Sequence, residues 1–270
     1  MSPHDRLSDR ERTQAEQRAY DDLAAQALAH LDEASLLLPE DIRSVPLGSL
    51  TVFALGLLGD VAGKRVLDLG GGEGIVAVAL ARGGGEVHLV DISEKQLGLA
   101  RLRARVNGVA RRIHLGRMAC EALALRDESF DCVFGDYILH HVDVAAAARE
   151  VARVLRPGGR AVFAETWGRN PLLRFARRFL AGRMGVARYG TPWERPLRPA
   201  DVARLRPVFR SVRTYHPEFC FFRLANTRVF KSPDRFPTVQ RLLKGLDAAV
   251  TCCLPFLRSF GYKVALELVK

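Results

Sequence analysis

The order of apolar and polar residues divides the chain into a helical beginning, an alternating middle and a less regular last third. Apolar residues recur at helical spacing between residues 8 and 33, which predicts an amphipathic helix there. A second apolar stretch, from Leu50 to Leu58, predicts a helix that leads into the core. Short apolar strands then alternate with helices as far as residue 165, and this alternation is typical of a parallel, doubly wound α/β sheet.

The alternating middle contains five predicted strands and three predicted helices. The strands cover residues 65–69, 86–90, 112–115, 130–134 and 160–165, and the helices cover residues 75–82, 94–107 and 144–155. After residue 165 the alternation stops. There the pattern predicts a basic amphipathic helix (171–184), a proline-containing loop (188–199), a short helix (200–205), two strands (209–215 and 219–224), an apolar-striped helix (239–256) and a closing strand (262–269).

The composition suits a large α/β domain. The 270 residues are 48% hydrophobic, which is enough to build a full core. No stretch of 18 uncharged apolar residues occurs and residues 1–18 are polar and charged, so we expect neither a transmembrane helix nor a secretory signal. The five cysteines are odd in number and form no Cys-x-x-Cys motif or Cys/His cluster, which favours free thiols in the cytoplasm and no metal site.

The net charge of +11 is unevenly distributed. Residues 1–60 carry 5 basic and 11 acidic side chains, whereas residues 167–270 carry 21 basic and 6 acidic ones, a net charge of +15. Such a basic segment suits nucleic acid, anionic lipid or an acidic substrate. Only 6 of the 41 basic residues are lysine, and an arginine bias of this kind often reflects codon composition, so we favour a solvated surface.

A glycine-rich loop carries the first candidate chemistry. The run Asp68-Leu-Gly-Gly-Gly-Glu-Gly74 lies between a predicted strand and a predicted helix, where glycine allows a sharp turn and a close approach to a ligand. Asp91 ends the second strand, 19 residues after Gly72, and its carboxylate suits the two hydroxyls of a ribose. Gly72 to Ala77 also fits the dinucleotide fingerprint G-x-G-x-x-[GA], so an NAD-dependent dehydrogenase is an alternative.

Three further features of the sequence distinguish between these interpretations of the glycine-rich loop. Asp68 lies two residues before the first glycine, Phe130 to Asp136 runs into Leu139-His140-His141, and Leu155-Arg-Pro-Gly158-Gly159 precedes the fifth strand. Together they resemble the class I S-adenosyl-L-methionine-dependent methyltransferase family, in the branch that contains small-molecule methyltransferases. The resemblance covers roughly residues 20–165.

The resemblance implies a fold and a cofactor site. The fold would be an α/β, doubly wound, seven-stranded and mostly parallel sheet with helices on both faces and one antiparallel strand near its edge. In such proteins the glycine loop wraps the methionyl part of S-adenosyl-L-methionine, one carboxylate holds the ribose, and two others stabilise the loop or meet the methionine end. The positions that correspond here are Gly70, Gly72 and Gly74 for the loop, Asp91 for the ribose, and Asp68 and Asp136 for the methionine end.

The adenine sub-site departs from the family pattern. An acidic residue in the family often contacts the adenine amine, but the corresponding position here is Ala119. We therefore expect adenine to rely on backbone groups of Ala119 and Cys120 and on packing against Ile92.

The resemblance places two histidines beside the transferred methyl group. A histidine with a near-neutral pKa suits the removal of a proton from a hydroxyl acceptor. His140 is the favoured base and His141 the alternative, and Glu165, at the end of the fifth strand, would orient the histidine. If the acceptor is an activated carbon, neither histidine need act as a base.

The acceptor side is expected to come from both ends of the chain. Aromatic side chains there would stack on a flat or lipid-like acceptor, or simply fill the core of a cap. The residues proposed to contact the acceptor are Tyr20, Trp167, Arg169, Tyr189 and Trp193. The basic helix at 171–184 is expected to cover its apolar face against the body, with a membrane surface as the alternative.

The sequence thus predicts O-methylation of a small hydrophobic or aromatic acceptor, such as a natural product of secondary metabolism or a lipid- or quinone-like molecule. C-methylation of a quinone or isoprenoid ring, an RNA or protein methyltransferase that uses the basic third, and a non-catalytic cofactor-binding protein are the alternatives. The run Gly135-Asp-Tyr-Ile138 lacks the Asn/Asp-Pro-Pro-aromatic signature of base methylases, which disfavours nucleic acid. We expect an N-terminal helical lid at 1–60, a cofactor-binding core at 61–166, and a substrate cap with closing strands of the same domain at 167–270.

Overall fold

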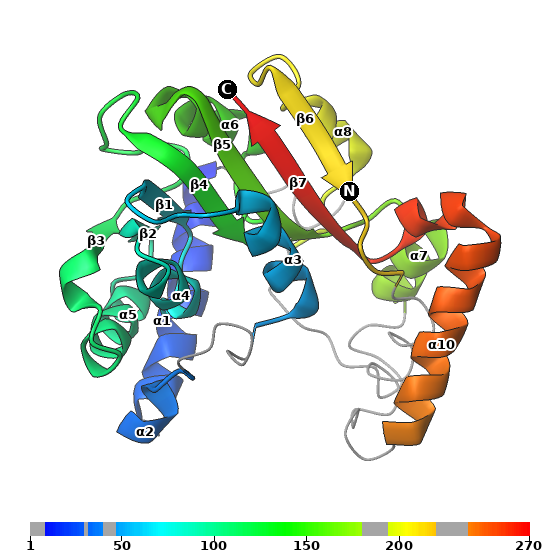
Figure 1. Cartoon of the computed structure of the whole chain (residues 1–270), viewed down its shortest axis with the longest axis horizontal. Helices are drawn as coiled ribbons and strands as arrows, with labels where there is room; N and C mark the ends of the chain where they lie inside the picture. Colours follow the sequence, from blue (N-terminus) through cyan, green and yellow to red (C-terminus); the bar gives the residue numbers. More distant parts are fainter. Residues whose placement is uncertain (1–8, 30–31, 40–46, 180–193, 220–236) are drawn as a thin grey trace.

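The computed structural model describes residues 9–29, 32–39, 47–179, 194–219 and 237–270. Seven strands form one sheet in the order β3-β2-β1-β4-β5-β7-β6 (Figure 1). They are β1 Arg65–Leu69, β2 Glu86–Asp91, β3 Ile113–Arg117, β4 Phe130–Asp136, β5 Leu155–Thr166, β6 Ser211–Tyr215 and β7 Lys263–Val269. β1 to β5 pair in parallel, and β7 runs antiparallel to both β5 and β6. The predicted doubly wound sheet with one antiparallel strand near its edge is therefore confirmed.

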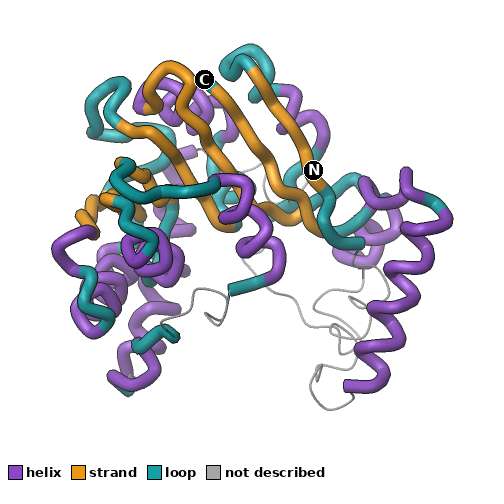
Figure 2. The backbone as a smooth tube through the Cα atoms, viewed as in Figure 1, coloured by secondary structure: helices purple, strands orange, loops and turns teal. Residues whose placement is uncertain are grey.

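Helices lie on both faces of this sheet (Figure 2). They are α1 Asp9–Ala29, α2 Glu33–Leu36, α3 Ser49–Leu58, α4 Ile75–Arg82, α5 Glu94–Val106, α6 Val144–Val154, α7 Pro171–Phe179, α8 Pro199–Ala203 and α10 Pro237–Cys253, with 3-10 turns η3 Ala110–Arg112 and η5 Pro255–Phe260. Side-chain hydrogen bonds cap the N-termini of two helices that follow strands. The Ser93 hydroxyl accepts the N–H of Gln96 at the start of α5, and Asp143 accepts that of Ala146 at the start of α6.

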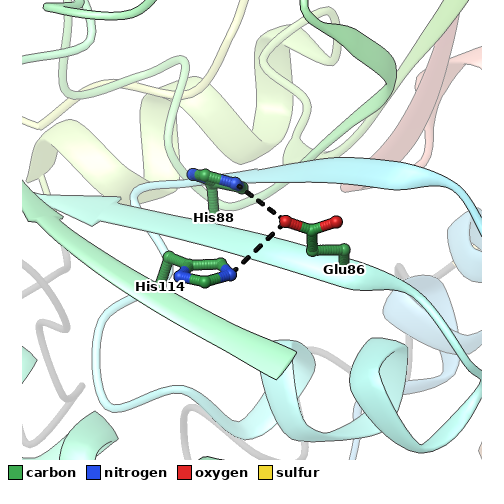
Figure 3. Close-up of side chains that lie close together, drawn as sticks. All are labelled: Glu86, His88 and His114. Carbon is green, nitrogen blue, oxygen red and sulfur yellow. Dashed lines mark ion pairs between the residues drawn. The ribbon is translucent and has the colours of Figure 1, made fainter. Parts of the chain in front are cut away.

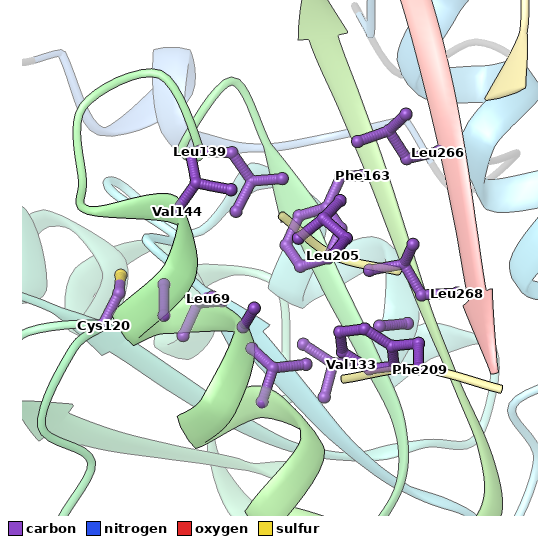
Figure 4. Packing of buried hydrophobic residues seen from close by; sticks show 14 of the residues in the cluster. Leu69, Cys120, Val133, Leu139, Val144, Phe163, Leu205, Phe209, Leu266 and Leu268 are labelled. Carbon is purple, nitrogen blue, oxygen red and sulfur yellow. The ribbon is translucent and has the colours of Figure 1, made fainter. Parts of the chain in front are cut away.

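Two buried clusters, one on each face, hold the sheet between its helices. On one face, fully buried Phe163 packs with Val133, Leu266 and Leu268 (Figure 4). On the other face, Phe134 and Leu89 pack against residues of α3, α4 and α5. Neighbouring residues of a strand point to opposite faces of the sheet. A central parallel strand that is covered on both faces therefore appears in the sequence as an unbroken run of apolar residues. This burial explains why the strands were visible in the sequence.

The largest differences from the sequence expectations lie outside the central strands. β5 begins at Leu155 rather than at residue 160, because Leu155 already pairs with Phe130. α10 ends at Cys253 rather than at residue 256, since Pro255 lacks a backbone N–H and opens the turn η5. α7 ends at Phe179, and the rest of the predicted helix to residue 184 lies outside the described residues, as does most of the predicted strand at 219–224.

The carboxyl ends of the parallel strands meet at one edge of the sheet, where α/β proteins bind ligands. Residues from α1 and α3 line the same cavity as residues that follow β1, β2 and β4. α1 is fixed there because the Ser93 hydroxyl, just after β2, donates to Asp21 over 2.6 Å. The N-terminal helix therefore covers the edge at which the predicted site residues gather.

Candidate active site

The loop after β1 can be built only with glycine at its critical positions. Gly70, Gly72 and Gly74 all have positive φ, at 67°, 52° and 81°. A Cβ atom at Gly70 would lie 2.4 Å from the side chain of Ile138, and one at Gly74 would lie 2.9 Å from Ala100. Gly70 and Gly72 line the cavity, whereas Gly74 turns the chain into α4 and lets α4 pack against α5.

Asp91 ties this loop to the end of β2. Its Oδ2 accepts the N–H of Gly72 at 3.0 Å, and its Oδ1 accepts the N–H of Ser93 at 2.9 Å. Burial raises the pKa of Asp91, although these hydrogen bonds oppose the rise. Each carboxylate oxygen keeps a second lone pair, so Asp91, which lines the cavity, can still accept hydrogen bonds from a ligand hydroxyl.

Asp68 is a buried carboxylate at the wall of the cavity. Its Oδ2 has no hydrogen-bond partner, and only 1% of the residue is exposed. Burial, and then the carboxylates of Asp136 and Asp91, raise the pKa of Asp68 to about 8. Asp136 accepts a hydrogen bond from the Thr51 hydroxyl at 2.9 Å, yet burial still raises its pKa to about 6. Acidic groups crowded in this way favour a cationic ligand between them.

A cavity of about 800 Å³ connects these carboxylates with the histidines that follow β4. Its glycine-loop side includes Asp68, Asp91, Ile92 and Cys120. The cavity is also lined by residues of α1, of the turn after β4, and of the C-terminal third. These are Glu16, Tyr20, Tyr137, His140, His141, Arg177, Glu194 and Tyr262.

His140 is held from behind by a buried carboxylate. Its Nδ1 lies 2.7 Å from Oε2 of Glu165, which is completely buried on β5. The other oxygen of Glu165 accepts the N–H of Leu139 at 2.6 Å. A carboxylate can only accept here, so Nδ1 carries the hydrogen and Nε2 keeps a lone pair. Tyr137, between β4 and the histidines, has a strained φ of 56°, which sets the sharp turn that brings His140 over Glu165.

His141 has a different environment, although its ring centre is only 4.1 Å from that of His140. Its Nε2 lies 3.1 Å from the Tyr20 hydroxyl, and its Nδ1 lies 3.2 Å from a carboxylate oxygen of Glu16. Burial alone lowers the pKa of His141, but the carboxylates of Glu16 and Glu194 outweigh it and raise the pKa. The charged form of His141 is therefore favoured.

Comparison with known proteins agrees with this geometry. A family model described as a methyltransferase domain matches residues 67–163. A ubiquinone biosynthesis O-methyltransferase from Alkalilimnicola ehrlichii is 36% identical over 176 residues, which cover 59% of this chain and 68% of that protein. The chain belongs to the class I S-adenosyl-L-methionine-dependent methyltransferases. The family predicted from the glycine loop and the His140-His141 run is confirmed.

Other methyltransferases match over shorter regions. A ubiquinone/menaquinone biosynthesis C-methyltransferase from Vibrio cholerae is 37% identical over 117 residues, 42% of this chain and 45% of that protein. For most of the curated relatives the matched region spans about half of their length. A structure described as a putative sarcosine dimethylglycine methyltransferase from Galdieria sulphuraria has a TM-score of 0.56 at 16% identity, covering 93% of this chain and 97% of that one. That likeness supports the methyltransferase fold.

The cofactor of this methyltransferase family fits the residues present. S-adenosyl-L-methionine carries a sulfonium and an ammonium group, and the cavity offers them several carboxylates, including the unpartnered oxygen of Asp68. Asp91, the residue predicted to hold the ribose hydroxyls, lines the cavity together with Ile92 and Cys120. Asp136, which accepts a hydrogen bond from Thr51, lines it as well. The crowding of acidic groups that is costly in the free chain would be relieved by a cationic ligand.

Several residues expected at the site of this methyltransferase lie elsewhere. Trp167 does not line the cavity: it is 4% exposed, belongs to the hydrophobic core and donates its indole N–H to the Ser259 carbonyl at 2.9 Å. Arg169 is also turned away, over the ring of Phe260. Ala119 is not among the lining residues either. Tyr189 and Trp193 lie outside the described residues.

Glu16, Thr51, Arg177 and Glu194 line the cavity although the sequence did not identify them. Thr51 sits in an apolar helix and touches Asp136 across 85 residues of sequence. Glu16 reaches His141 from the N-terminal helix. Only the helical stripe that placed Tyr20 near the site gave a signal for Glu16, since residues four apart share one helix face.

Proposed function

We propose that this chain methylates a hydroxyl of a small aromatic, quinol-like acceptor, with His140 as the general base. The observation that carries the proposal is the buried Glu165–His140 pair, whose histidine lines the same cavity as the residues suited to the cofactor. The names of the matched relatives support it, because several are ubiquinone biosynthesis O-methyltransferases. Tyr20, Tyr137 and Tyr262 line the acceptor side and suit an aromatic ring.

Different residues of the chain have different roles in the reaction. When bound, S-adenosyl-L-methionine would supply an electrophilic methyl group, whose bond to sulfur breaks so that S-adenosylhomocysteine leaves. Nε2 of His140 takes the proton of the acceptor hydroxyl, so that the oxygen can bond the methyl carbon. Glu165 fixes the tautomer and stabilises the imidazolium that results. His140 later releases this proton to solvent, and the walls of the cavity align the acceptor with the methyl group.

C-methylation of a quinone ring is the second candidate. It is favoured by the match to C-methyltransferases of ubiquinone and menaquinone biosynthesis. In that case an electron-rich ring carbon would take the methyl group and then lose its own proton to solvent, and His140 would only position a ring hydroxyl by a hydrogen bond. The two functions differ in how strongly the reaction depends on proton removal by His140.

Substitution of the base separates these functions. His140→Ala is expected to lower the turnover of a catechol-type acceptor by about 10²–10⁴ while the affinity for S-adenosylhomocysteine stays unchanged. Glu165→Gln should give a smaller loss, and the activity of the wild type should fall towards acid pH as the imidazole protonates. Arg101→Ala, at an exposed position of α5, serves as the control and should keep full activity. Near-normal turnover by His140→Ala with a flat pH profile would contradict the role of His140.

The surface around α7 suits contact with a membrane, from which a lipid-like acceptor would be drawn. None of the residues of α7 is buried, so the expectation that this helix covers its apolar face against the body is wrong. Leu172, Phe175 and Phe179 are 65%, 60% and 45% exposed, and they lie beside exposed arginines. Arg177 of the same helix reaches the cavity and contacts the Tyr262 hydroxyl at 3.4 Å. No described helix has an apolar stretch long enough to span a bilayer.

We therefore propose that α7 lies on an anionic lipid surface, with its phenylalanines in the interface and its arginines beside phosphates. Sedimentation with phosphatidylglycerol vesicles should deplete the chain from solution, and phosphatidylcholine vesicles should not. Phe175→Ser combined with Phe179→Ser should weaken this binding at least tenfold without loss of secondary structure. Equal binding by this variant would show that the helix does not carry the contact.

A further inference from the structure

Two histidines and a glutamate form a compact cluster on the sheet, far from the cavity. Glu86 and His88 are alternate residues of β2 and therefore point to the same face. His114 is the direct neighbour of His88 across the parallel pair of β2 and β3. Figure 3 shows the carboxylate of Glu86 directed at both imidazole rings. The cluster lies near the amino ends of these strands, whereas the cavity lies at their carboxyl ends.

The distances in this cluster are close to those of a metal site. Nε2 of His114 lies 3.4 Å from Oε1 of Glu86, and Nε2 of His88 lies 3.9 Å from the same oxygen. The three potential ligand atoms are all within 4.8 Å of one another. Ligand bonds of about 2.0–2.1 Å in tetrahedral geometry place two ligands about 3.3 Å apart, so only small side-chain rotations would be required.

The environment of His88 is a second indication of a metal site. Its Nε2 is buried and has no hydrogen-bond partner. The ring is held edge-on to Phe130 at 5.1 Å between centres, and it lies 4.7 Å from the ring of His114. His88 is therefore oriented with an unused nitrogen towards the other two ligands. The side chains of Glu86 and His114 are 52% and 50% exposed, which gives an ion access and leaves room for a water ligand.

We propose that Glu86, His88 and His114 bind a divalent first-row transition metal, with Zn²⁺ as the reference ion. Two imidazoles and one carboxylate are a ligand set that suits Zn²⁺ and not Mg²⁺, which prefers oxygen ligands. Among the described strands, β3 lies at the edge of the sheet and pairs with β2 alone. The ion would clamp this edge strand to its neighbour and stabilise the fold, while taking no part in methyl transfer.

Zinc binding to the chelator-treated chain tests the proposal. Titration of Zn²⁺ against a competing dye should show a site with micromolar or tighter affinity, and His114→Ala and Glu86→Gln should each weaken it at least tenfold. These two variants are preferred because their side chains are half exposed, whereas His88 packs against Phe130. Saturating Zn²⁺ should raise the melting temperature of the wild type by about 5 °C and that of His114→Ala by much less.

A second cluster in the cavity supplies the control. His140, His141 and Glu194 also bring ligand atoms within 4.8 Å of one another. His141→Ala should keep the proposed ion, and Co²⁺ bound to it should still show the visible absorption of a tetrahedral site. Absence of micromolar binding, binding that His114→Ala leaves unchanged, or binding that His141→Ala removes would each overturn the proposal.

Discussion

Replacing Asp68 by asparagine should stabilise the cofactor-free chain at alkaline pH. The carboxylate is buried, its Oδ2 has no hydrogen-bond partner, and burial together with Asp136 and Asp91 raises its pKa to about 8. Asparagine has nearly the same shape and carries no charge. The substitution therefore removes the cost of an ionised carboxylate and leaves most of the packing in place.

The size and the pH range of this effect follow from linkage. A pKa that rises from 3.8 to about 8 makes the ionised form about 6 kcal/mol less favourable in the folded chain than in the unfolded chain. Because the folded chain holds the proton more tightly, the free energy of unfolding falls as the pH rises from about 4 to about 8, and then levels off. Asp68→Asn lacks this fall, so its advantage should be near zero at pH 4 and reach up to about 6 kcal/mol above pH 8.

Urea unfolding of both chains without cofactor at pH 5, 7 and 9 measures this difference, with the exposed substitution Asp22→Asn as the control. Calorimetry at pH 7 adds a second readout. Binding of S-adenosylhomocysteine should release a proton from the wild type, since the ligand ammonium favours ionised Asp68, and should release none from Asp68→Asn. A stability difference that is independent of pH, or equal affinity of both chains for S-adenosylhomocysteine, would refute the reasoning.

Two further predictions concern the same cavity. Asp91→Ala should weaken the binding of S-adenosylhomocysteine by about 1–3 kcal/mol in calorimetry, because hydrogen bonds to the ribose are lost, and unchanged affinity in a folded variant would exclude Asp91 from the site. Glu16→Gln should lower the pKa of His141 in an NMR titration, since a carboxylate 3.2 Å from Nδ1 is neutralised. The raised pKa of His141 stabilises the folded chain at acid pH, and this stabilisation is lost as the pH rises through that pKa. Glu16→Gln should therefore destabilise the chain at pH 5 more than at pH 9. An unaltered NMR titration of His141 would contradict this.

The sequence predicted the centre of the fold well because its signals are local. Parallel strands covered on both faces appear as short apolar runs, and the loop from Gly70 to Gly74 needs glycine for steric reasons that act within a few residues. Asp91 could be placed because it ends a strand that was itself predicted. The family resemblance then supplied the expected positions of His140 and His141.

Contacts between distant segments could not be predicted in the same way. The approach of Glu16 to His141 and the hydrogen bond of Thr51 to Asp136 depend on how α1 and α3 dock on the sheet, which no periodicity encodes. Trp167 was assigned to the acceptor because an aromatic residue after a strand suits a cap as well as a core. Its burial is decided by packing against α8 and β7, and that packing is known only from the three-dimensional structure.

The cluster of Glu86, His88 and His114 shows the same limit for a metal site. A search for Cys-x-x-Cys or sequential Cys/His motifs does not find it, because His114 is brought beside His88 by strand register. A one-residue shift of that register would turn His114 to the opposite face. Ligand sets that span paired strands therefore require the sheet pairing before they can be recognised.

The position of the transferred methyl group tests the central proposal most directly. The chain, incubated with S-adenosyl-L-methionine labelled with ¹³C in its methyl group and with a catechol-type acceptor that carries a prenyl tail, yields a product whose labelled carbon can be assigned by NMR. We predict a methyl group bonded to oxygen, formed by the wild type and reduced about 10²–10⁴-fold in His140→Ala. A methyl group bonded to a ring carbon, formed equally well without His140, would contradict O-methylation by the Glu165–His140 pair.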